Sequence, residues 1–157
     1  MEYKIREIKE EEIVELHRFL YLAIYVHKGE TPPPFDIIYK PELQVYVDNL
    51  GKEKDDHILV AEAENRIVGA VWVRIMDDYG HIDDDTPSLI ISVEKEYRGK
   101  GIGSSLLSAM LSLLSDHGYK SVSLSCQKEN YAVSLYKRLG FCIVRDIDEE
   151  YIMRKTF

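Results

Sequence analysis

A short glycine-rich segment of the sequence has the composition of an anion-binding turn. Glycines stand at positions 99, 101 and 103, between an apolar run that ends at Val93 and a helical pattern that begins near Ile102. Glycine lets the backbone take positive φ and lets a ligand reach the amide groups without meeting a Cβ atom. The first turn of a helix also has unpaired N–H groups, so this segment predicts a phosphate or pyrophosphate site, with Arg98 and Lys100 adding positive charge.

Two common nucleotide motifs do not fit this segment. The dinucleotide motif G-x-G-x-x-G would need a glycine at 104 or 106, where the chain has Ser104 and Leu106. The P-loop pattern G-x-x-x-x-G-K-[ST] does not occur in the sequence. A glycine turn considered alone also fits a plain tight connection between a strand and a helix.

The turn instead matches R-x-x-G-x-G, from Arg98 to Gly103, and in this it resembles the acetyl-CoA pyrophosphate motif of the GNAT superfamily of N-acetyltransferases. A second run, Asn130 to Phe141, resembles the other signature of that family through Asn130, Leu135-Tyr136 and Gly140-Phe141. The two motifs stand in the order and spacing of the family. The resemblance covers residues 58–157 well, and residues 1–57 only in the order of elements.

The resemblance implies a donor site for acetyl-CoA. The pyrophosphate is expected on the backbone amides from Arg98 to Ser104, and the pantetheine arm on the backbone around Ile91. The N–H of Val93 is expected to stabilise the oxyanion that forms on the thioester. Core packing of these strand side chains is compatible with this role, because only their main chain is used. The expected cofactor-binding residues are Ile91, Ser92, Val93, Arg98, Gly99, Lys100, Gly101, Ile102, Gly103, Ser104, Asn130 and Tyr136.

Two side chains of the second motif are assigned roles by the same resemblance. Tyr136 stands where the family commonly has a tyrosine near the sulfur, so it is expected to donate to the departing thiolate; the alternative is an aromatic ring that only packs on its helix face. Asn130 is expected to contact pantetheine or a water, or to serve only as a helix N-cap.

The base that takes the proton of the amine is the least determined part of the site. An alkylammonium is almost fully charged at neutral pH, so a base or a water chain is required. Many relatives have a glutamate at the positions of Ser88 or Ser125. We rank Asp85 first as the catalytic carboxylate, because it is the closest of the loop aspartates to the start of the strand. The alternatives are Asp83, Asp84, Glu94, His81 or a water chain.

The composition limits the classes of partner. A net charge of -8 argues against a surface for nucleic acid, and weakly favours cationic acceptors. No run approaches the twenty apolar residues of a membrane span, and the first residues lack the apolar core of a signal peptide, so a cytoplasmic protein is expected. Cys126 and Cys142 lack the spacing of metal ligands, so no metal site is expected, and both cysteines are expected to be reduced core residues.

The pattern of apolar residues predicts the elements that position these groups. Strands are expected where apolar residues alternate or run together, and helices where they recur every three to four residues. Tyrosines concentrate in the early helical part, which shapes the acceptor pocket in GNAT relatives. The expected strands are 3–8, 57–63, 66–76, 88–93, 121–126, 141–144 and 151–155, and the expected helices are 10–28, 41–50, one from 102 and one after Asn130.

These observations predict one domain, residues 1–157, with an α/β fold. By resemblance it has a mixed, mostly antiparallel central sheet with splayed parallel strands, flanked by about four helices. The expected function is N-acetyltransferase, with direct transfer from acetyl-CoA to a primary amine in a ternary complex. The alternative is a non-catalytic acyl-CoA-binding or sensing domain. The acceptor stays open between a small amine, a polyamine, an aminoglycoside, an amino acid and a protein amine, and a homodimer, common in relatives, is one option.

Overall fold

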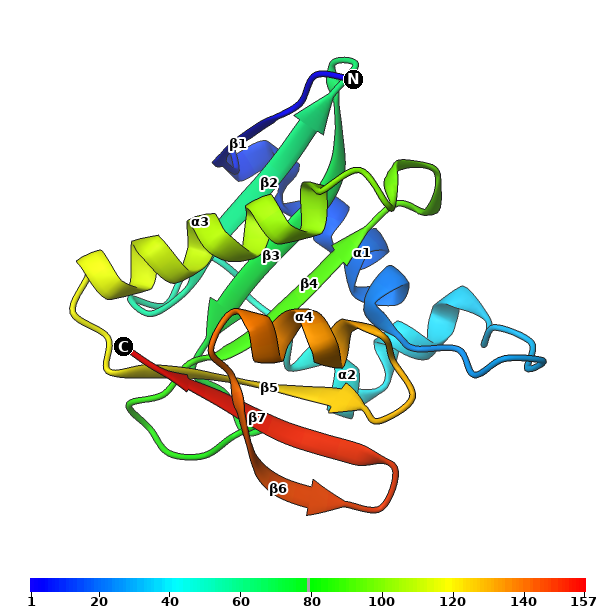
Figure 1. Ribbon diagram of the computed structural model, residues 1–157. Helices are drawn as coiled ribbons and strands as arrows, with labels where there is room; N and C mark the ends of the chain where they lie inside the picture. The colour runs from blue at the N-terminus through cyan, green and yellow to red at the C-terminus, as the bar shows by residue number, and fades with distance from the viewer. Residues whose placement is uncertain (79) are drawn as a thin grey trace.

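The computed structural model describes residues 1–78 and 80–157. Within them the chain forms one seven-stranded sheet and four α-helices, joined by short 3-10 turns (Figure 1). The strands are β1 (Lys4–Glu7), β2 (His57–Ala63), β3 (Arg66–Arg74), β4 (Ser88–Val93), β5 (Ser121–Gln127), β6 (Cys142–Ile147) and β7 (Glu150–Thr156). The helices are α1 (Leu16–Ala23), α2 (Pro41–Gln44), α3 (Ile102–Asp116) and α4 (Ala132–Arg138).

The sheet has the strand order β1-β2-β3-β4-β5-β7-β6, in which β4 and β5 are parallel and the other neighbours are antiparallel. Among the described residues, the parallel strands pair at one position, between Ser88, the first residue of β4, and Ser123 of β5. Beyond this point β4 and β5 diverge, as Figure 1 shows. The predicted mixed sheet with splayed parallel strands is therefore confirmed.

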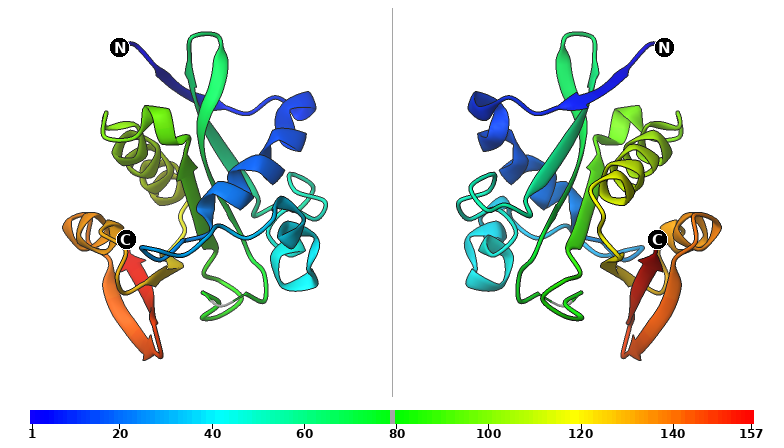
Figure 2. Two further views of the ribbon diagram at one scale, coloured as in Figure 1. Left: turned by 90° about the vertical axis from the view of Figure 1, so that its right-hand side faces the viewer. Right: turned by 90° about the vertical axis from the view of Figure 1, so that its left-hand side faces the viewer.

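The helices cover the two faces of the sheet separately (Figure 2). Helices α3 and α4 lie on one face, where Leu106 and Met110 of α3 are fully buried against the sheet. Helices α1 and α2 lie on the other, where Phe19 of α1 packs in one cluster with Trp72 of β3. In the described part of the chain, no helix combines the length and the apolar character that crossing a bilayer requires.

The hairpin of β2 and β3 shows how local chemistry sets the sheet. Its turn residues Glu64 and Asn65 both have positive φ, 53° and 63°. Two consecutive residues with positive φ give the type I′ turn, whose twist matches that of paired strands. The predicted hairpin is confirmed, with β3 ending at Arg74.

The early helical region differs from its prediction. The expected helix 10–28 is a 3-10 segment, Glu10–Glu15, followed by α1, which ends at Ala23 because Ile24 is extended. A 3-10 helix at Phe35–Tyr39 was not predicted, and α2 has four residues.

The prediction for Cys142 was wrong. Cys126 is buried, but Cys142 is exposed, although both thiols are free. The reason is that β6 is the outer strand of the sheet, and all six of its residues are exposed.

Candidate active site

The glycine turn between β4 and α3 has the backbone that its sequence predicts. Gly99 and Gly101 have φ of 74° and 84°, a region that costs other residues about 1–2 kcal/mol. Arg98 closes the turn, since its Nε donates a hydrogen bond of 2.9 Å to the carbonyl of Val93. This bond holds the guanidinium group at the end of β4, beside the amides of the turn.

Helix α3 begins directly at this turn. Gly101 is its N-cap residue, and the carbonyl of Gly101 accepts the first helical bond, from the N–H of Ser105 at 3.0 Å. The N–H groups of the first helical turn have no carbonyl partner within the helix and point along its axis toward the turn. Tyr3, the residue before β1, supports the arrangement, because its hydroxyl lies 2.7 Å from Oγ of Ser105. The site thus presents several backbone donors at the positive end of a 15-residue helix.

The main chain of β4 supplies a second row of polar groups. The N–H of Glu94 donates to the carbonyl of Val68 on β3. In an antiparallel pair the direction of the N–H and C=O groups alternates along the strand, so those of Ile91 and Val93 point away from β3, toward β5. Since β5 pairs with β4 only at Ser88 and Ser123 in the described chain, these groups face the gap between the diverging strands.

A cavity of about 570 Å³ joins these features. It extends from the glycine turn along the end of β4 to α4, and the end of α1 with the following loop forms its other wall. The predicted cofactor-binding residues that line it are Ile91, Ser92, Val93, Arg98, Gly99, Gly101, Ile102, Gly103, Ser104, Asn130 and Tyr136. Lys100 is exposed and does not line it.

Tyr136 lies on α4 with its ring buried, 8% exposed, and its edge against Phe141 at a centroid distance of 5.7 Å. In the described part of the chain its hydroxyl has no hydrogen-bond partner, and the residue lines the cavity. Burial raises the pKa of this hydroxyl above its usual value, with smaller contributions from Cys126 and Tyr131. Tyr136 therefore stays protonated at neutral pH, and it can donate a hydrogen bond to a ligand.

Asn130 combines a structural bond with a position at the cavity. Its Oδ1 accepts a hydrogen bond of 2.9 Å from the N–H of Ala132, the first residue of α4. The side-chain amide group keeps its donors for other partners. The N-cap residue of α4 is Tyr131, so Asn130 stands one residue before the predicted capping position, although its side chain still bonds to the first residue of the helix. Contact with the pantetheine arm stays a prediction.

The predicted base candidates lie away from this cavity. Asp85 is exposed in the loop before β4, and it does not line the cavity. Asp83 is exposed too, and its Oδ1 accepts the N–H of Asp85 at 2.9 Å. Ring Nε2 of His81 lies 3.6 Å from Asp84. The structure therefore groups these four residues with one another, and it does not bring them to the predicted donor site.

Glu94 is committed to ion pairs. Its carboxylate is 9% exposed and accepts hydrogen bonds from Arg18 of α1 and Arg66 of β3. These ion pairs tie α1 to the sheet and occupy the carboxylate. Glu94 does not line the cavity.

Sequence reasoning missed one carboxylate, that of Asp78. It is partly buried, and it accepts hydrogen bonds from Oγ of Ser88 at 2.8 Å and from the hydroxyl of Tyr46 at 3.1 Å. Burial raises the pKa of Asp78 above its usual value, and the bonds from Ser88 and Tyr46 partly oppose this. Its partners are 10 and 32 residues away in the sequence, so spacing gave no signal.

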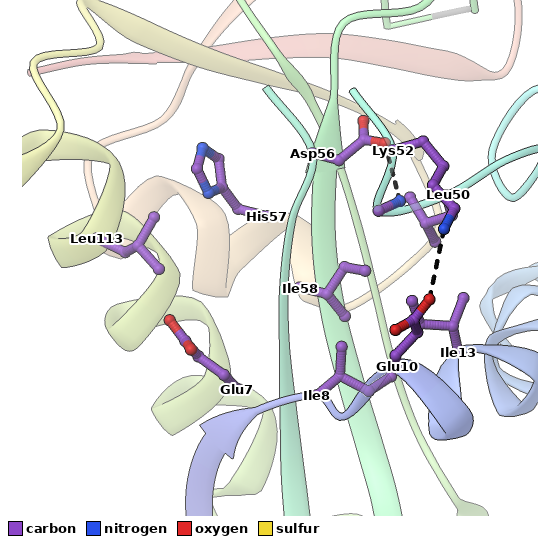
Figure 3. Close-up of a pocket in the computed structure, with 11 residues that line it drawn as sticks. Glu7, Ile8, Glu10, Ile13, Leu50, Lys52, Asp56, His57, Ile58 and Leu113 are labelled. Carbon is purple, nitrogen blue, oxygen red and sulfur yellow. Dashed lines mark hydrogen bonds and ion pairs between the residues drawn. The ribbon is translucent and has the colours of Figure 1, made fainter. Parts of the chain in front are cut away.

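A second cavity, of about 470 Å³, lies beside β1, β2 and the start of the first 3-10 segment (Figure 3). Three of its charged groups have partners. Asp56 accepts the N–H of Gly51 and pairs with Arg74, and Lys52 lies 3.5 Å from Glu10. None of the residues of the glycine turn or of α4 lines it, so it has no part in the predicted chemistry.

The fold of the chain is that of solved acetyltransferase structures. The chain is similar over 100% of its length to the whole of an N-acetyltransferase (PaiA) from Thermoplasma acidophilum, solved in complex with coenzyme A, with a TM-score of 0.74 and 20% identity. At this identity the likeness establishes the fold.

Comparison of sequences establishes the family. The profile described as "Acetyltransferase (GNAT) family" matches residues 14–141, and the chain therefore belongs to this family. It is 32% identical over 126 residues to an N-alpha-acetyltransferase from Saccharolobus solfataricus, which covers 70% of this chain and 74% of that protein. It is also 35% identical over 83 residues to human N-acetyltransferase 8B, covering 52% of this chain, but it spans only 37% of that protein.

Proposed function

We propose that the chain is an acetyl-CoA-dependent N-acetyltransferase that moves the acetyl group directly to a primary amine in a ternary complex. The observation that carries this proposal is the single cavity that joins the glycine turn, the outward-facing main chain of β4 and the hydroxyl of Tyr136. The turn supplies N–H donors for a phosphate group, and the main chain of β4 supplies hydrogen-bond partners for amides. The hydroxyl of Tyr136 supplies a further hydrogen-bond donor. A thioester with a phosphate-bearing arm needs these three features in this order.

The donor would be bound mainly by main chain. The amides from Arg98 to Ser104 would hold the pyrophosphate, since they lie at a helix N-terminus with two glycines in the left-handed region. The main chain of Ile91 and Val93 would pair with the amides of the pantetheine arm, in the place that a neighbouring strand would otherwise occupy. The side chains of these strand residues remain free to pack in the core, as the sequence led us to expect.

The chemistry then needs two donors. As the amine nitrogen bonds to the thioester carbon, negative charge grows on the carbonyl oxygen, and the N–H of Val93 would stabilise it. The carbon–sulfur bond then breaks, and the electron pair leaves on sulfur. Tyr136 would donate its hydroxyl hydrogen bond to this thiolate, which its raised pKa allows because the hydroxyl stays protonated.

Direct transfer is favoured by the positions of the cysteines. Burial raises the pKa of Cys126 to about 11, so little thiolate is available at neutral pH, and Cys126 does not line the cavity. Cys142 is exposed on β6. Neither thiol is suited to carry the acetyl group between donor and acceptor.

For the acceptor we propose an amine with a free α-amino group as the first class to test, because a relative that aligns over most of its length is named an N-alpha-acetyltransferase. The net charge of -8 favours a cationic acceptor in general. A cytoplasmic site of action and a homodimer stay predictions of the sequence and the resemblance.

The test is a panel of acceptors with release of the CoA thiol as the readout. The panel would contain a short peptide with a free N-terminus, the same peptide with a blocked N-terminus, spermidine and a free amino acid. We expect release that depends on a free amine. Tight binding of acetyl-CoA without release for any member would favour the sensing domain instead.

A further inference from the structure

The cavity at the end of β4 has two walls of different origin. The glycine turn, β4 and α4 supply the predicted donor site, and the end of α1 with the following loop supplies the opposite wall. This opposite wall, the α1 wall, includes the residues from Tyr21 to Val26. Just beyond it, Nδ1 of His27 lies 2.9 Å from Oε2 of Glu129 in the loop before α4. An amine that meets the thioester in a ternary complex enters between these walls, so their separation limits how closely it approaches.

Two side chains of β4 hold α1, and they belong to the residues on either side of Val93. Oγ of Ser92 donates a buried hydrogen bond of 2.7 Å to the carbonyl of Phe19 in α1. The carboxylate of Glu94, 9% exposed, is bound by Arg18, the residue before Phe19. Side chains alternate along a strand, so Ser92 and Glu94 point to the face that α1 covers, while Val93 packs in the cluster of α3. Helix α1 is therefore bonded to the residues that flank the predicted oxyanion donor.

The carboxylate of Glu94 joins three elements. Arg18 of α1 and Arg66 of β3 each donate to one of its oxygens. Arg18 also donates to the carbonyl of Ile67 on β3 at 3.4 Å, and its guanidinium lies 4.4 Å from the ring centroid of Phe19. Charge-assisted hydrogen bonds are shorter and stronger than neutral ones, so they hold α1 in a narrow range of positions. Only Arg18 belongs to the helix that continues into the α1 wall, and Arg66 therefore offers a matched comparison.

We propose that Ser92 and Glu94 are positioning residues for the acceptor, because through α1 they hold the wall that faces the donor site. This inference rests on the proposed N-acetyltransferase function and deepens it. The side chain of Ser92 thus serves the α1 wall, while the donor is bound by main chain on the other side of the cavity. A misplacement of about 1 Å at the reacting atoms can cost about 10²-fold in rate. Loosening the attachment of α1 should therefore impair use of the amine and leave the binding of acetyl-CoA unchanged.

The test compares Arg18→Met with Arg66→Met, using the amine of the acceptor panel that the parent acetylates best. Each variant removes one of the two guanidinium groups from the carboxylate of Glu94 and keeps the other, so a general effect of the weakened ion pair appears in both. Only Arg18→Met loosens α1. At saturating acetyl-CoA we expect its kcat/KM for the amine to fall about 10- to 10²-fold. The affinity for acetyl-CoA, measured by calorimetry, should equal the parent's, and Arg66→Met should keep the parent's kcat/KM.

The outcomes separate the proposal from a merely structural role. Equal values of kcat/KM in the two arginine variants would overturn the proposal, because the ion pair would then act on stability alone. A change in Arg18→Met that is confined to the affinity for acetyl-CoA would overturn it as well. A parent that binds no acetyl-CoA, or that acetylates no amine of the panel, would instead reject the proposed function.

A further variant, Ser92→Ala, covers the case in which Arg18→Met does not fold. It removes the bond from Oγ to the carbonyl of Phe19 and leaves the main chain of β4 in place. We expect its kcat/KM for the same amine to fall while the affinity for acetyl-CoA stays at the parent's value. A parent-like kcat/KM in the folded variant, or a loss of affinity for acetyl-CoA in its place, would overturn the proposal.

Discussion

Replacement of Tyr136 by phenylalanine isolates the step in which the thiolate leaves. The change keeps the ring, which packs edge-on against Phe141 at 5.7 Å, and removes only a hydroxyl that has no partner in the described chain. We therefore expect folding stability to change by less than about 1 kcal/mol, since no intramolecular hydrogen bond is lost. The affinity for acetyl-CoA should also change little, because the interaction strengthens only as charge develops on sulfur.

The expected effect of Tyr136→Phe on the rate follows from the leaving group. General acids contribute about 10²- to 10⁴-fold, and a thiolate needs less help than an alkoxide, so a loss of about 10²-fold is expected, or about 2.7 kcal/mol in the barrier. The loss should appear equally in kcat and kcat/KM. Thiol release measured with a good acceptor gives both constants, and calorimetry gives the affinity. Parent-like rates, with the chemical step shown to limit turnover, would refute the role.

Three further predictions concern binding and stability. Gly101→Glu should abolish the binding of acetyl-CoA, measured by calorimetry. The fold should survive, because a φ of 84° costs a glutamate only about 1–2 kcal/mol, and an unchanged affinity would contradict the proposed pyrophosphate site. Arg74→Met should lower the free energy of unfolding by about 3–5 kcal/mol in urea, because Asp56, 1% exposed, loses its partner; a loss under about 1 kcal/mol would contradict this. Burial and His117 lower the pKa of His57, so the stability it contributes is present above pH 6.5 and is lost as the pH falls below it; His57→Gln should flatten this dependence.

The sequence was most informative where function uses the backbone. Gly99 and Gly101 have the positive φ for which they were singled out, and Ile91 and Val93 direct their main chain into the gap between the strands. Such features follow from local rules, because a glycine pattern and a strand pattern each specify their own geometry. The assignment of these residues to acetyl-CoA remains a prediction.

Features that depend on tertiary contacts could not be predicted from the sequence. Helix α1 ends at Ala23, although the helical pattern of apolar residues continues to His27. The residues from Tyr21 to Val26 form one wall of the cavity, with Ile24 in an extended conformation. Local periodicity cannot foresee where a helix leaves its axis to cover a site in another part of the fold.

The carboxylates show the same limit most clearly. Asp85 was ranked by its closeness to a strand in the sequence, but closeness along the chain says nothing about which face or end of the sheet a side chain reaches. Glu94 is bound by Arg18 and Arg66, which are 76 and 28 residues away. Asp78 gains its environment from Ser88 and Tyr46, and no spacing rule connects the three. Burial and long-range partners distinguish a partly buried carboxylate from a solvated loop residue.

The most direct test of the N-acetyltransferase function is mass spectrometry of a peptide with a free N-terminus after incubation with the protein and acetyl-CoA, alongside the release of CoA thiol. We predict one acetyl group per peptide, in equal amount to the thiol released, and no transfer to the same peptide with a blocked N-terminus. If acetyl-CoA binds with high affinity but neither this peptide nor any amine of the acceptor panel is acetylated, the assignment as an N-acetyltransferase is contradicted.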